Sequence, residues 1–221
     1  MRVVDETGST NADLLAAAAA GAPNRTVLAA RHQTAGRGRL DRRWEAPPGV
    51  NLLVSLLFTE VPEVPHELTQ RVGLAAVAAA RSVAGVEAAL KWPNDVLVGD
   101  EKLAGVLAQS AIMGDRRVVV VGIGVNVGWA PPGAARLGEG IDPLQVLAAM
   151  LRSFDEQPVD VWPEYRAHLA TIGHSVRVEL AAGQVEGRAL DVERDGRLVV
   201  LDECGITHRF DVGDVVHLRP T

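Results

Sequence analysis

Residues 90–128 read LKWPNDVLVGDEKLAGVLAQSAIMGDRRVVVVGIGVNVG. Three apolar segments in this stretch are separated by the dipeptides Gly99-Asp100 and Gly114-Asp115. Segments rich in Val, Leu and Ile that are joined by short turns of this kind are typical of strands in an antiparallel meander. We therefore expect three neighbouring strands here, with the rest of the domain organised around them.

The segments before and after the meander alternate between expected strands and helices. Apolar strand patterns occur near residues 3–4, at 26–31 and at 51–58. Helical patterns that are bounded by capping residues, glycine or proline cover residues 11–20, 65–83, 143–151 and 161–169. The sequence thus predicts an α+β domain.

The pattern of the chain changes after Gly173. Short β-branched segments separated by Gly or Asp turns cover residues 176–180, 186–192, 198–201 and 215–218. A succession of such short strands is typical of a small barrel that is separate from the main sheet. We place the domain boundary near Thr171, which divides the chain into residues 1–171 and 172–221.

The composition favours a folded protein with one substantial core. The 221 residues carry a net charge of −6 and are 48% hydrophobic, which argues against extensive disorder. The single Cys204 cannot form an intrachain disulfide, so we expect a buried thiol and a reducing, cytoplasmic setting. The N-terminus lacks a secretory apolar segment, and the alanines at 16–20 are too few to span a bilayer.

A basic island interrupts this acidic chain, because residues 36–44 read GRGRLDRRW. Glycines let the backbone approach an anion closely, and arginines offer planar donors to phosphate or carboxylate oxygens. In an extended segment Arg37 and Arg39 reach the same side, whereas Arg42 and Arg43 either stay solvated or pair with Asp41 and Glu45. The alternative is a mobile basic loop or an RNA-binding tract, although the net charge argues against a general nucleic-acid binder.

The segment KWPND at 91–95 is an unusual strand end, because Pro93 cannot donate to a sheet ladder. Taken alone, it predicts a turn with a packed tryptophan. The functional alternative is that Asp95 binds a metal or accepts a proton beside a phosphate site. The following turn folds the chain back, so Lys102 should lie near Asp95 at one edge of the sheet, and Gly105 should leave room for a ligand there.

Two other patterns predict no site. GIGVN at 122–126 superficially matches a dinucleotide-binding fingerprint, but it lacks the third glycine and does not lead into a helix. The six histidines lack metal-ligand spacing, so we interpret them as structural or exposed.

Five motifs occur in one order: GSTN at 8–11, GRGRLDRRW at 36–44, KWPND at 91–95, KLAGVLAQ at 102–109 and GIGVNV at 122–127. Together with Gln33 they resemble the biotin protein ligases, also called biotin–[acetyl-CoA-carboxylase] ligases, over most of the chain. The resemblance implies a class II synthetase-like catalytic domain with a mixed, largely antiparallel sheet flanked by helices. It also implies that the C-terminal domain is a small SH3-like β-barrel.

A two-step reaction is implied by this resemblance. The carboxylate of biotin attacks the α-phosphate of Mg-ATP, which gives biotinoyl-5′-AMP and pyrophosphate. The ε-amine of a lysine on a biotin carboxyl carrier domain then attacks the mixed anhydride, and AMP leaves. ATP and biotin are therefore the expected substrates, with Mg²⁺ required. Residues 36–44 are expected to close over the intermediate and to shield it from water.

The family's functional positions transfer to this chain residue by residue. Those implied to bind biotin are Ser9, Thr10, Asn11, Gln33, Gly36, Arg37, Lys102 and Gly105. Those implied to bind ATP are Arg37, Arg39, Arg42, Trp44, Asn94, Lys102 and Asn126. The implied catalytic residues are Lys102, Arg39 and Asp95. Asp95 either helps to place Mg-ATP or deprotonates the incoming lysine, and Trp44 either supports the core or contacts the ligand.

The chain departs from its relatives at two points. Many relatives carry an acidic residue at the position of Gln109, which we expect to face a neighbour outside the pocket. Some relatives begin with a winged helix-turn-helix that represses transcription, whereas the catalytic pattern here begins within the first few residues. We therefore expect no DNA binding and no transcriptional repressor activity. The resemblance also implies a carboxylase carrier domain as the partner, no nucleic acid, no membrane, and a monomer or weak homodimer.

Two other functions would explain part of this pattern. A lipoate or octanoyl transfer enzyme shares the general fold and acyl-adenylate chemistry, but it is not expected to combine the arginine motif with KWPND. An RNA-binding module would use the arginines and would need neither Lys102 nor Asp95. The ordered set of motifs favours the biotin ligase over both.

Overall fold

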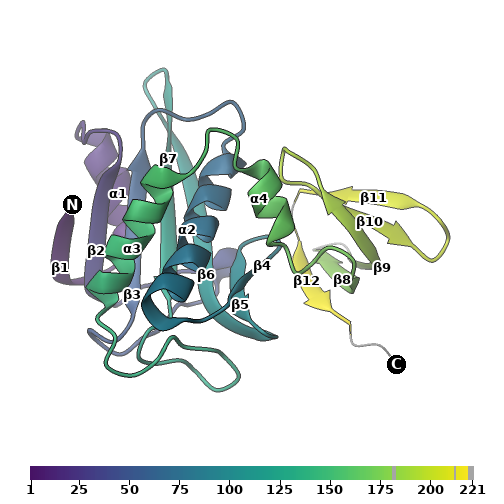
Figure 1. The fold of residues 1–221 in the computed structure, drawn as a ribbon. Helices are drawn as coiled ribbons and strands as arrows, with labels where there is room; N and C mark the ends of the chain where they lie inside the picture. The colour runs from purple at the N-terminus through teal and green to yellow at the C-terminus, as the bar shows by residue number, and fades with distance from the viewer. Residues whose placement is uncertain (181–182, 212, 219–221) are drawn as a thin grey trace.

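The computed structural model describes residues 1–180, 183–211 and 213–218. Its larger part is a seven-stranded sheet of order β1-β2-β3-β7-β6-β5-β4 (Figure 1). The strands are β1 (Arg2–Thr7), β2 (Thr26–Gln33), β3 (Leu52–Phe58), β4 (Ala89–Lys91), β5 (Asp95–Val98), β6 (Glu101–Met113) and β7 (Arg116–Val125). β1 and β2 are parallel and the other neighbours are antiparallel, so the sheet is mixed, as expected.

The meander predicted for residues 90–128 is confirmed. β5, β6 and β7 are consecutive antiparallel neighbours. Their turns contain Gly99 and Gly114 with φ of 58° and 66°, a conformation that glycine adopts without steric cost. Gly105 of β6 lies directly opposite Gly124 of β7, so the middle of the sheet presents a patch without side chains.

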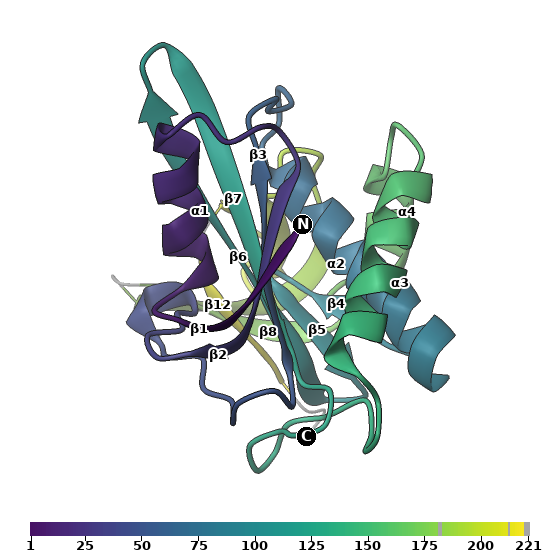
Figure 2. The same cartoon turned by 90° about the vertical axis from the view of Figure 1, so that its left-hand side faces the viewer.

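Helices cover both faces of this sheet (Figure 2). They are α1 (Thr10–Ala19), α2 (His66–Ala84), α3 (Pro143–Glu156) and α4 (Trp162–Ala167). α1 lies on one face, where Leu14 clusters with Leu57 and Val120 of the strands. Within the described ranges, no helix is long and apolar enough to cross a membrane.

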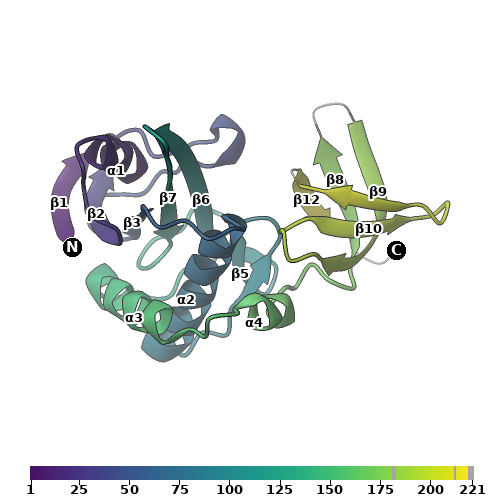
Figure 3. The same cartoon turned by 90° about the horizontal axis from the view of Figure 1, so that it is seen from above.

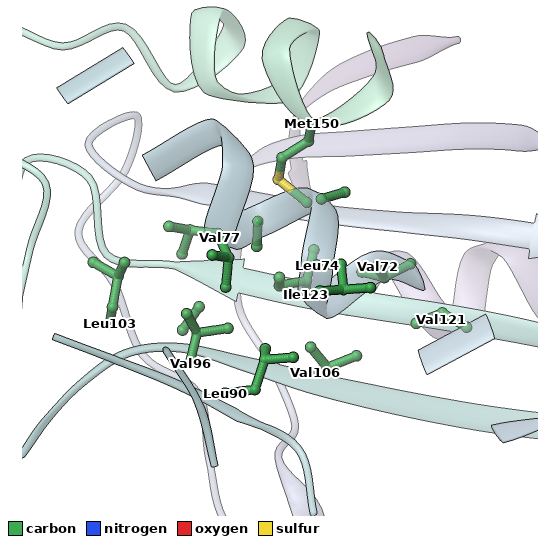
Figure 4. Packing of buried hydrophobic residues seen from close by; sticks show 14 of the residues in the cluster. Val72, Leu74, Val77, Leu90, Val96, Leu103, Val106, Val121, Ile123 and Met150 are labelled. Carbon is green, nitrogen blue, oxygen red and sulfur yellow. The ribbon is translucent and has the colours of Figure 1, made fainter. Parts of the chain in front are cut away.

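The main hydrophobic core lies on the opposite face, between the sheet and helices α2 and α3. Figure 4 shows Leu74 and Val77 of α2 close to Val106 and Ile123 of the sheet, with Met150 of α3 above them. These side chains are at most 8% exposed. Small and branched residues therefore fill the interior, as the low aromatic content predicts.

The C-terminal part forms a separate five-stranded sheet of order β11-β10-β9-β8-β12 (Figure 3). Its antiparallel strands are β8 (Ser175–Leu180), β9 (Gly183–Val192), β10 (Leu198–Asp202), β11 (Thr207–Phe210) and β12 (Asp214–His217). The four predicted segments all contain strands, whereas β11 was not predicted because THRF contains a single apolar residue. The expected α+β architecture, with helices around a mixed sheet and a C-terminal antiparallel sheet, is confirmed.

The prediction of a buried Cys204 is wrong. Its thiol is free and exposed, because the residue lies in the turn between β10 and β11. Asp202 organises this turn: its Oδ1 accepts hydrogen bonds from the backbone amides of Cys204 at 2.9 Å and Ile206 at 2.8 Å. A carboxylate that caps its own turn keeps the intervening side chains at the surface.

The two sheets meet beside the β4–β5 turn. Trp92 is 1% exposed, and its Nε1 donates to the carbonyl oxygen of Gly196 in the turn between β9 and β10 at 2.8 Å. Its backbone N–H donates to Oγ1 of Thr171 at 3.0 Å. The packed tryptophan predicted for KWPND is therefore confirmed, and it anchors the junction next to Asn94 and Asp95.

Candidate active site

One cavity of about 760 Å³ gathers the predicted site residues. It lies between the central strands, β12 and residues 36–44, which we call the arginine loop. The predicted residues at its wall are Ser9, Thr10, Asn11, Gln33, Arg37, Arg39, Arg42, Trp44, Asn94, Asp95, Lys102, Gly105 and Asn126. Residues that are scattered over most of the catalytic sequence are thus brought to one place.

Gly36, which the resemblance implies as a biotin contact, is the one predicted site residue that does not line the cavity. Its carbonyl oxygen accepts a hydrogen bond from the amide of Trp44 at 3.0 Å. A Cβ at Gly36 would lie 2.5 Å from the carbonyl oxygen of Trp44, so the two backbones approach too closely for a side chain. The structure therefore gives Gly36 a role in shaping the arginine loop, and does not place it at the expected biotin contact.

Neutral side chains form a hydrogen-bonded chain at one end of the cavity. Oε1 of Gln33 accepts from the backbone N–H of Thr10 at 2.7 Å and from its hydroxyl at 3.0 Å. The hydroxyls of Thr10 and Ser55 are 2.7 Å apart, and Ser55 donates to Oδ1 of Asn11 at 2.6 Å. A network of this kind fixes the orientation of amides and hydroxyls, as recognition of a neutral polar ligand requires.

Gln109 supports this end from outside the cavity. Its Oε1 accepts from Nδ2 of Asn11 at 2.9 Å, and the same Nδ2 donates to the carbonyl oxygen of Leu107 at 3.1 Å. Gln109 itself is outside the cavity wall, as predicted, but the neighbour that it contacts, Asn11, belongs to that wall. Its neutral amide completes the hydrogen bonds of Asn11.

Ser9 stands at the N-cap of α1 with an extended backbone, at φ −159° and ψ 126°. A serine at this position usually accepts a hydrogen bond from an amide of the first helical turn. Here the side chain makes no capping hydrogen bond, and the residue lines the cavity. Its hydroxyl therefore remains available to a ligand.

Glycines form the floor of the cavity. A Cβ at Gly122 would lie 2.2 Å from Oδ1 of Asn11, and one at Gly124 would lie 2.4 Å from the Trp44 indole. At Gly105 the indole would be 3.2 Å away. Trp44 thus rests on the glycine floor and forms part of the cavity wall, with its Nε1 buried and unpartnered.

Lys102 and Asp95 form an ion pair at the wall, with Nζ 2.6 Å from Oδ1. This confirms the prediction that the hairpin turn brings the two residues to one edge. The Lys102 ammonium also lies 5.7 Å from the centroid of the Trp44 ring. Both charged side chains are partly exposed, at 38% and 22%, so a ligand can compete for either of them.

Arg39 presents a guanidinium whose charge is only partly compensated. Its Nη1 donates to Oδ1 of Asn94 at 3.4 Å, while Nδ2 of Asn94 donates to the carbonyl oxygen of Val106 at 2.7 Å. Burial lowers the pKa of Arg39, and the nearby carboxylates of Asp214 and Asp95 oppose this shift. A partly desolvated cation that borders a cavity is suited to bind an anion.

The arginine loop folds back on itself like a small hairpin. The amide of Gly38 donates to the carbonyl oxygen of Arg42 at 2.7 Å, which adds to the backbone contact between Gly36 and Trp44. The partners of the outer arginines, left open from the sequence, are now defined. Arg42 pairs with Asp214 of the C-terminal sheet, whereas Arg43 lies 3.8 Å from Glu45.

Asn126 lies at the cavity wall, but its amide is engaged within the protein. It is 2% exposed, and its Nδ2 donates to the carbonyl oxygens of Lys102 at 3.3 Å and Ala135 at 3.0 Å. Its Oδ1 accepts from Nδ2 of Asn51 at 3.4 Å. The structure thus shows Asn126 holding the backbone that carries Lys102.

Residues that could hold a metal are few. Among the described residues, no group of three or more His, Cys, Asp and Glu side chains is arranged around a common point. Mg²⁺ in nucleotide enzymes is often held by only one or two carboxylates together with substrate phosphates. The residues at this cavity fit that arrangement. Asp95 is one of the carboxylates at the cavity wall, and its place beside Lys102 would suit this role.

Sequence reasoning missed part of the wall. The C-terminal sheet contributes Glu179, Asp214, Val215 and Val216. No motif marks these residues, because they approach the cavity only when the two sheets dock. Ser55 was also missed, although a lone serine inside the apolar strand NLLVSLLF is a visible signal of a buried polar contact.

Comparison with known proteins gives the family. Residues 3–126 match the biotin/lipoate A/B protein ligase family, and residues 171–218 match the biotin protein ligase C terminal domain. A biotin–[acetyl-CoA-carboxylase] ligase from Mycobacterium tuberculosis is 43% identical over 98% of this chain and 88% of the relative. A bifunctional ligase/repressor BirA from Bacillus subtilis is 30% identical over 84% of this chain and 64% of that relative.

A solved structure shares the whole arrangement of the chain. A biotin protein ligase from Aquifex aeolicus in complex with biotin and ATP superposes with a TM-score of 0.80. The alignment has 26% identity and covers 99% of this chain and 98% of the other. The chain therefore belongs to the biotin/lipoate A/B protein ligase family, within its biotin protein ligase branch.

Proposed function

We propose that the protein forms biotinoyl-5′-AMP from biotin and Mg-ATP and transfers the biotinoyl group to a lysine of a biotin carboxyl carrier domain. The names of the relatives support the substrate class, since one is a biotin–[acetyl-CoA-carboxylase] ligase and another was solved with biotin and ATP. The proposed catalytic unit is residues 1–171, followed by a C-terminal domain of residues 172–221, whose first strand begins at Ser175.

A single observation carries this proposal: one glycine floor joins a neutral polar site to a cationic site. Gly122 lies against Asn11 of the neutral network, while Gly124 and Gly105 lie against Trp44 and Lys102. Biotin has a neutral ureido ring at one end and a carboxylate at the other. The floor would accept the ligand lengthwise, with the ring at the hydrogen-bonded end and the carboxylate near Lys102.

The first step brings a carboxylate against a triphosphate, so negative charge must be neutralised before the two can meet. Lys102 and Arg39 would supply fixed positive charge where the new bond forms to the α-phosphorus and pyrophosphate departs. The carboxylate of biotin would replace Asp95 as the partner of Lys102, because the two anions compete for the same ammonium group. Closure of the arginine loop then protects the anhydride from water.

The second step needs a group that accepts the proton lost when the carrier lysine attacks the carbonyl carbon and AMP leaves. Asp95 is available for this task or for placing Mg-ATP, and Asp95→Asn separates the two. A loss of adenylation that extra Mg²⁺ partly restores assigns Asp95 to nucleotide placement. Normal adenylation with slow transfer assigns it to proton removal.

The experiment that tests the function is ATP–pyrophosphate exchange by the purified protein with Mg²⁺ and with biotin, lipoate or no acid. We expect exchange with biotin and none above background with lipoate. Exchange with lipoate alone would move the protein to the lipoate branch of the family. Absence of exchange with both acids would refute the proposed adenylation.

Transfer is tested separately with a biotin carboxyl carrier domain as acceptor. We expect one biotinoyl group per domain, detected by intact mass, and no modification when the acceptor lysine is replaced by arginine. Modification of the arginine variant to the same extent would contradict a specific transfer.

A further inference from the structure

The C-terminal sheet reaches into the cavity through the first residues of β12. Asp214, Val215 and Val216 line the cavity, although nothing in the family motifs points to them. Asp214 is held in place by antiparallel pairing with Glu179 of β8. One wall of the site is therefore part of a different sheet from the one that carries Lys102.

The arginine loop touches this wall at two successive residues. Arg42 donates from Nη2 to the carboxylate of Asp214, and Nη2 of Arg39 donates to the carbonyl oxygen of Gly213 at 3.2 Å. The side chain of Asp214 is 19% exposed, whereas that of Arg42 is 65% exposed. Asp214 is thus the fixed, more buried member of the pair, and Arg42 is the member that the loop brings to it.

The four positive charges of the arginine loop make its contact with Asp214 important for closure. The loop crowds Arg37, Arg39, Arg42 and Arg43 into seven consecutive residues, and their mutual repulsion favours an open loop. A carboxylate on the facing sheet offsets that repulsion when the loop is closed. The same carboxylate partly offsets the cost of burying the Arg39 guanidinium, because it raises the pKa that burial lowers.

From these contacts we infer that Asp214 is a positioning residue, which holds the arginine loop closed over the cavity through Arg42 and keeps Arg39 aimed at the ligand. The C-terminal sheet would thereby control how long the reaction intermediate stays in the site. This inference rests on the proposed function for the identity of the intermediate. The loop contact itself does not depend on that function.

The loop contact is tested first, without any substrate, by hydrogen exchange of the peptide that contains residues 36–44. Asp214→Asn keeps the shape of the side chain and removes its charge, so we expect this peptide to exchange about fivefold faster. Arg42→Gln breaks the pair from the other side and should give a similar increase. Asp214→Glu keeps the charge and should restore at least half of the protection.

Asp191→Asn is the matched control. Asp191 pairs with Arg166 at 2.7 Å between α4 and the C-terminal sheet, and it does not line the cavity. Its loss should leave exchange of the arginine loop unchanged while removing an ion pair of the same kind. Equal exchange in wild type, Asp214→Asn and Arg42→Gln, with all melting temperatures similar, would overturn the inference.

The second readout is the lifetime of the bound intermediate. In a chase experiment with preformed biotinoyl-AMP, we expect Asp214→Asn to release it about fivefold faster than wild type or Asp191→Asn. The rate constant for adenylate formation should change less than the release rate. Faster loop exchange with no binding of biotinoyl-AMP by any variant would support the loop contact and refute the proposed function. Faster exchange with an unchanged release rate would overturn the control of the intermediate by Asp214.

Discussion

Lys102 carries its charge at the wall of the cavity, where a carboxylate and a phosphate would meet. The Lys102 side chain is 38% exposed and its ammonium group pairs with Asp95, so the residue contributes little to the stability of the core. We expect Lys102→Ala to lower the initial rate of ATP–pyrophosphate exchange at least about 100-fold. The free energy of unfolding should change by less than about 1 kcal/mol.

Exchange assays and urea unfolding on the same preparation check both parts of this prediction. A variant with near-normal exchange would remove Lys102 from the catalytic residues. A variant that unfolds much more easily would instead make its loss of activity a consequence of folding.

Arg39 is expected to act after the first step as well, by holding the charged intermediate under the closed loop. Arg39→Ala removes its contacts with Asn94 and Gly213, so we expect biotinoyl-AMP to be lost about tenfold faster. The measurement is a chase of labelled intermediate. Arg81→Ala, which removes a surface pair with Glu87, is the control and should release it at the wild-type rate.

The sequence predicted which residues lie close together where a short turn joins them. Charged or amide side chains in short motifs, such as Lys102 and Asp95, were placed together by one hairpin turn. Cys204 shows the opposite case, because hydrophobic neighbours predicted burial while the side chain of Asp202 fixed an exposed turn. That turn depends on a side-chain contact that composition does not report.

At the scale of elements, Ser55 links strand β3 to the start of α1. It is 0% exposed, and its hydroxyl contacts both Thr10 and Asn11. Ser55→Ala leaves the amide oxygen of Asn11 without this donor, so we expect a loss of about 1–2 kcal/mol in the free energy of unfolding. Biotin affinity should fall as well, because the neutral end of the cavity loses its fixed orientation.

The change is measured by urea unfolding and by calorimetric titration with biotin. Ser82→Ala is the control, since Ser82 donates to the carbonyl oxygen of Ala79 within α2 and lies outside the cavity. It should leave biotin affinity unchanged. Equal affinity in Ser55→Ala and wild type would show that the network does not orient the ligand site.

Most elements could be predicted because their patterns are local. The meander has long apolar strands and glycine turns, and α2 has a helical apolar face. Strand β11 was missed because three of its four residues are polar, so only its pairing with β10 marks it as a strand. The hairpin shape of the arginine loop was also not predicted, since its backbone contacts follow no hydrophobic pattern.

At the scale of the whole molecule, the active site depends on docking of two sheets that are separate in the sequence. The indole of Trp92 is buried against the turn between β9 and β10, and the carboxylate of Asp214 pairs with Arg42 of the arginine loop. The sequence predicts a boundary near Thr171, but it contains no sign of which C-terminal residues face the cavity. Contacts between distant segments require the relative position of the domains, which local patterns do not contain.

The junction between the sheets carries a pH-sensitive group. The pKa of His217 is lowered to about 4, chiefly by burial and further by the nearby Lys91 and His174. Asp100 acts in the opposite direction. The ring of His217 stacks on that of His174 with centroids 5.1 Å apart, so protonation of His217 would place a charge within this packing.

The sign of the pH effect follows from these values. An unfolded chain protonates His217 near pH 6.5, whereas the folded protein resists protonation down to pH about 4. The stabilising contribution is therefore complete above pH 6.5 and is lost as the pH falls toward 4. Between pH 7.5 and 5 we expect a loss of about 1 kcal/mol, after allowance for the partial exposure of the ring. In urea unfolding, the free energy of unfolding of His217→Gln should fall correspondingly less over this interval, because glutamine does not titrate. An identical decrease in both proteins would show that folding does not lower the pKa of His217 and that other groups set the acid sensitivity.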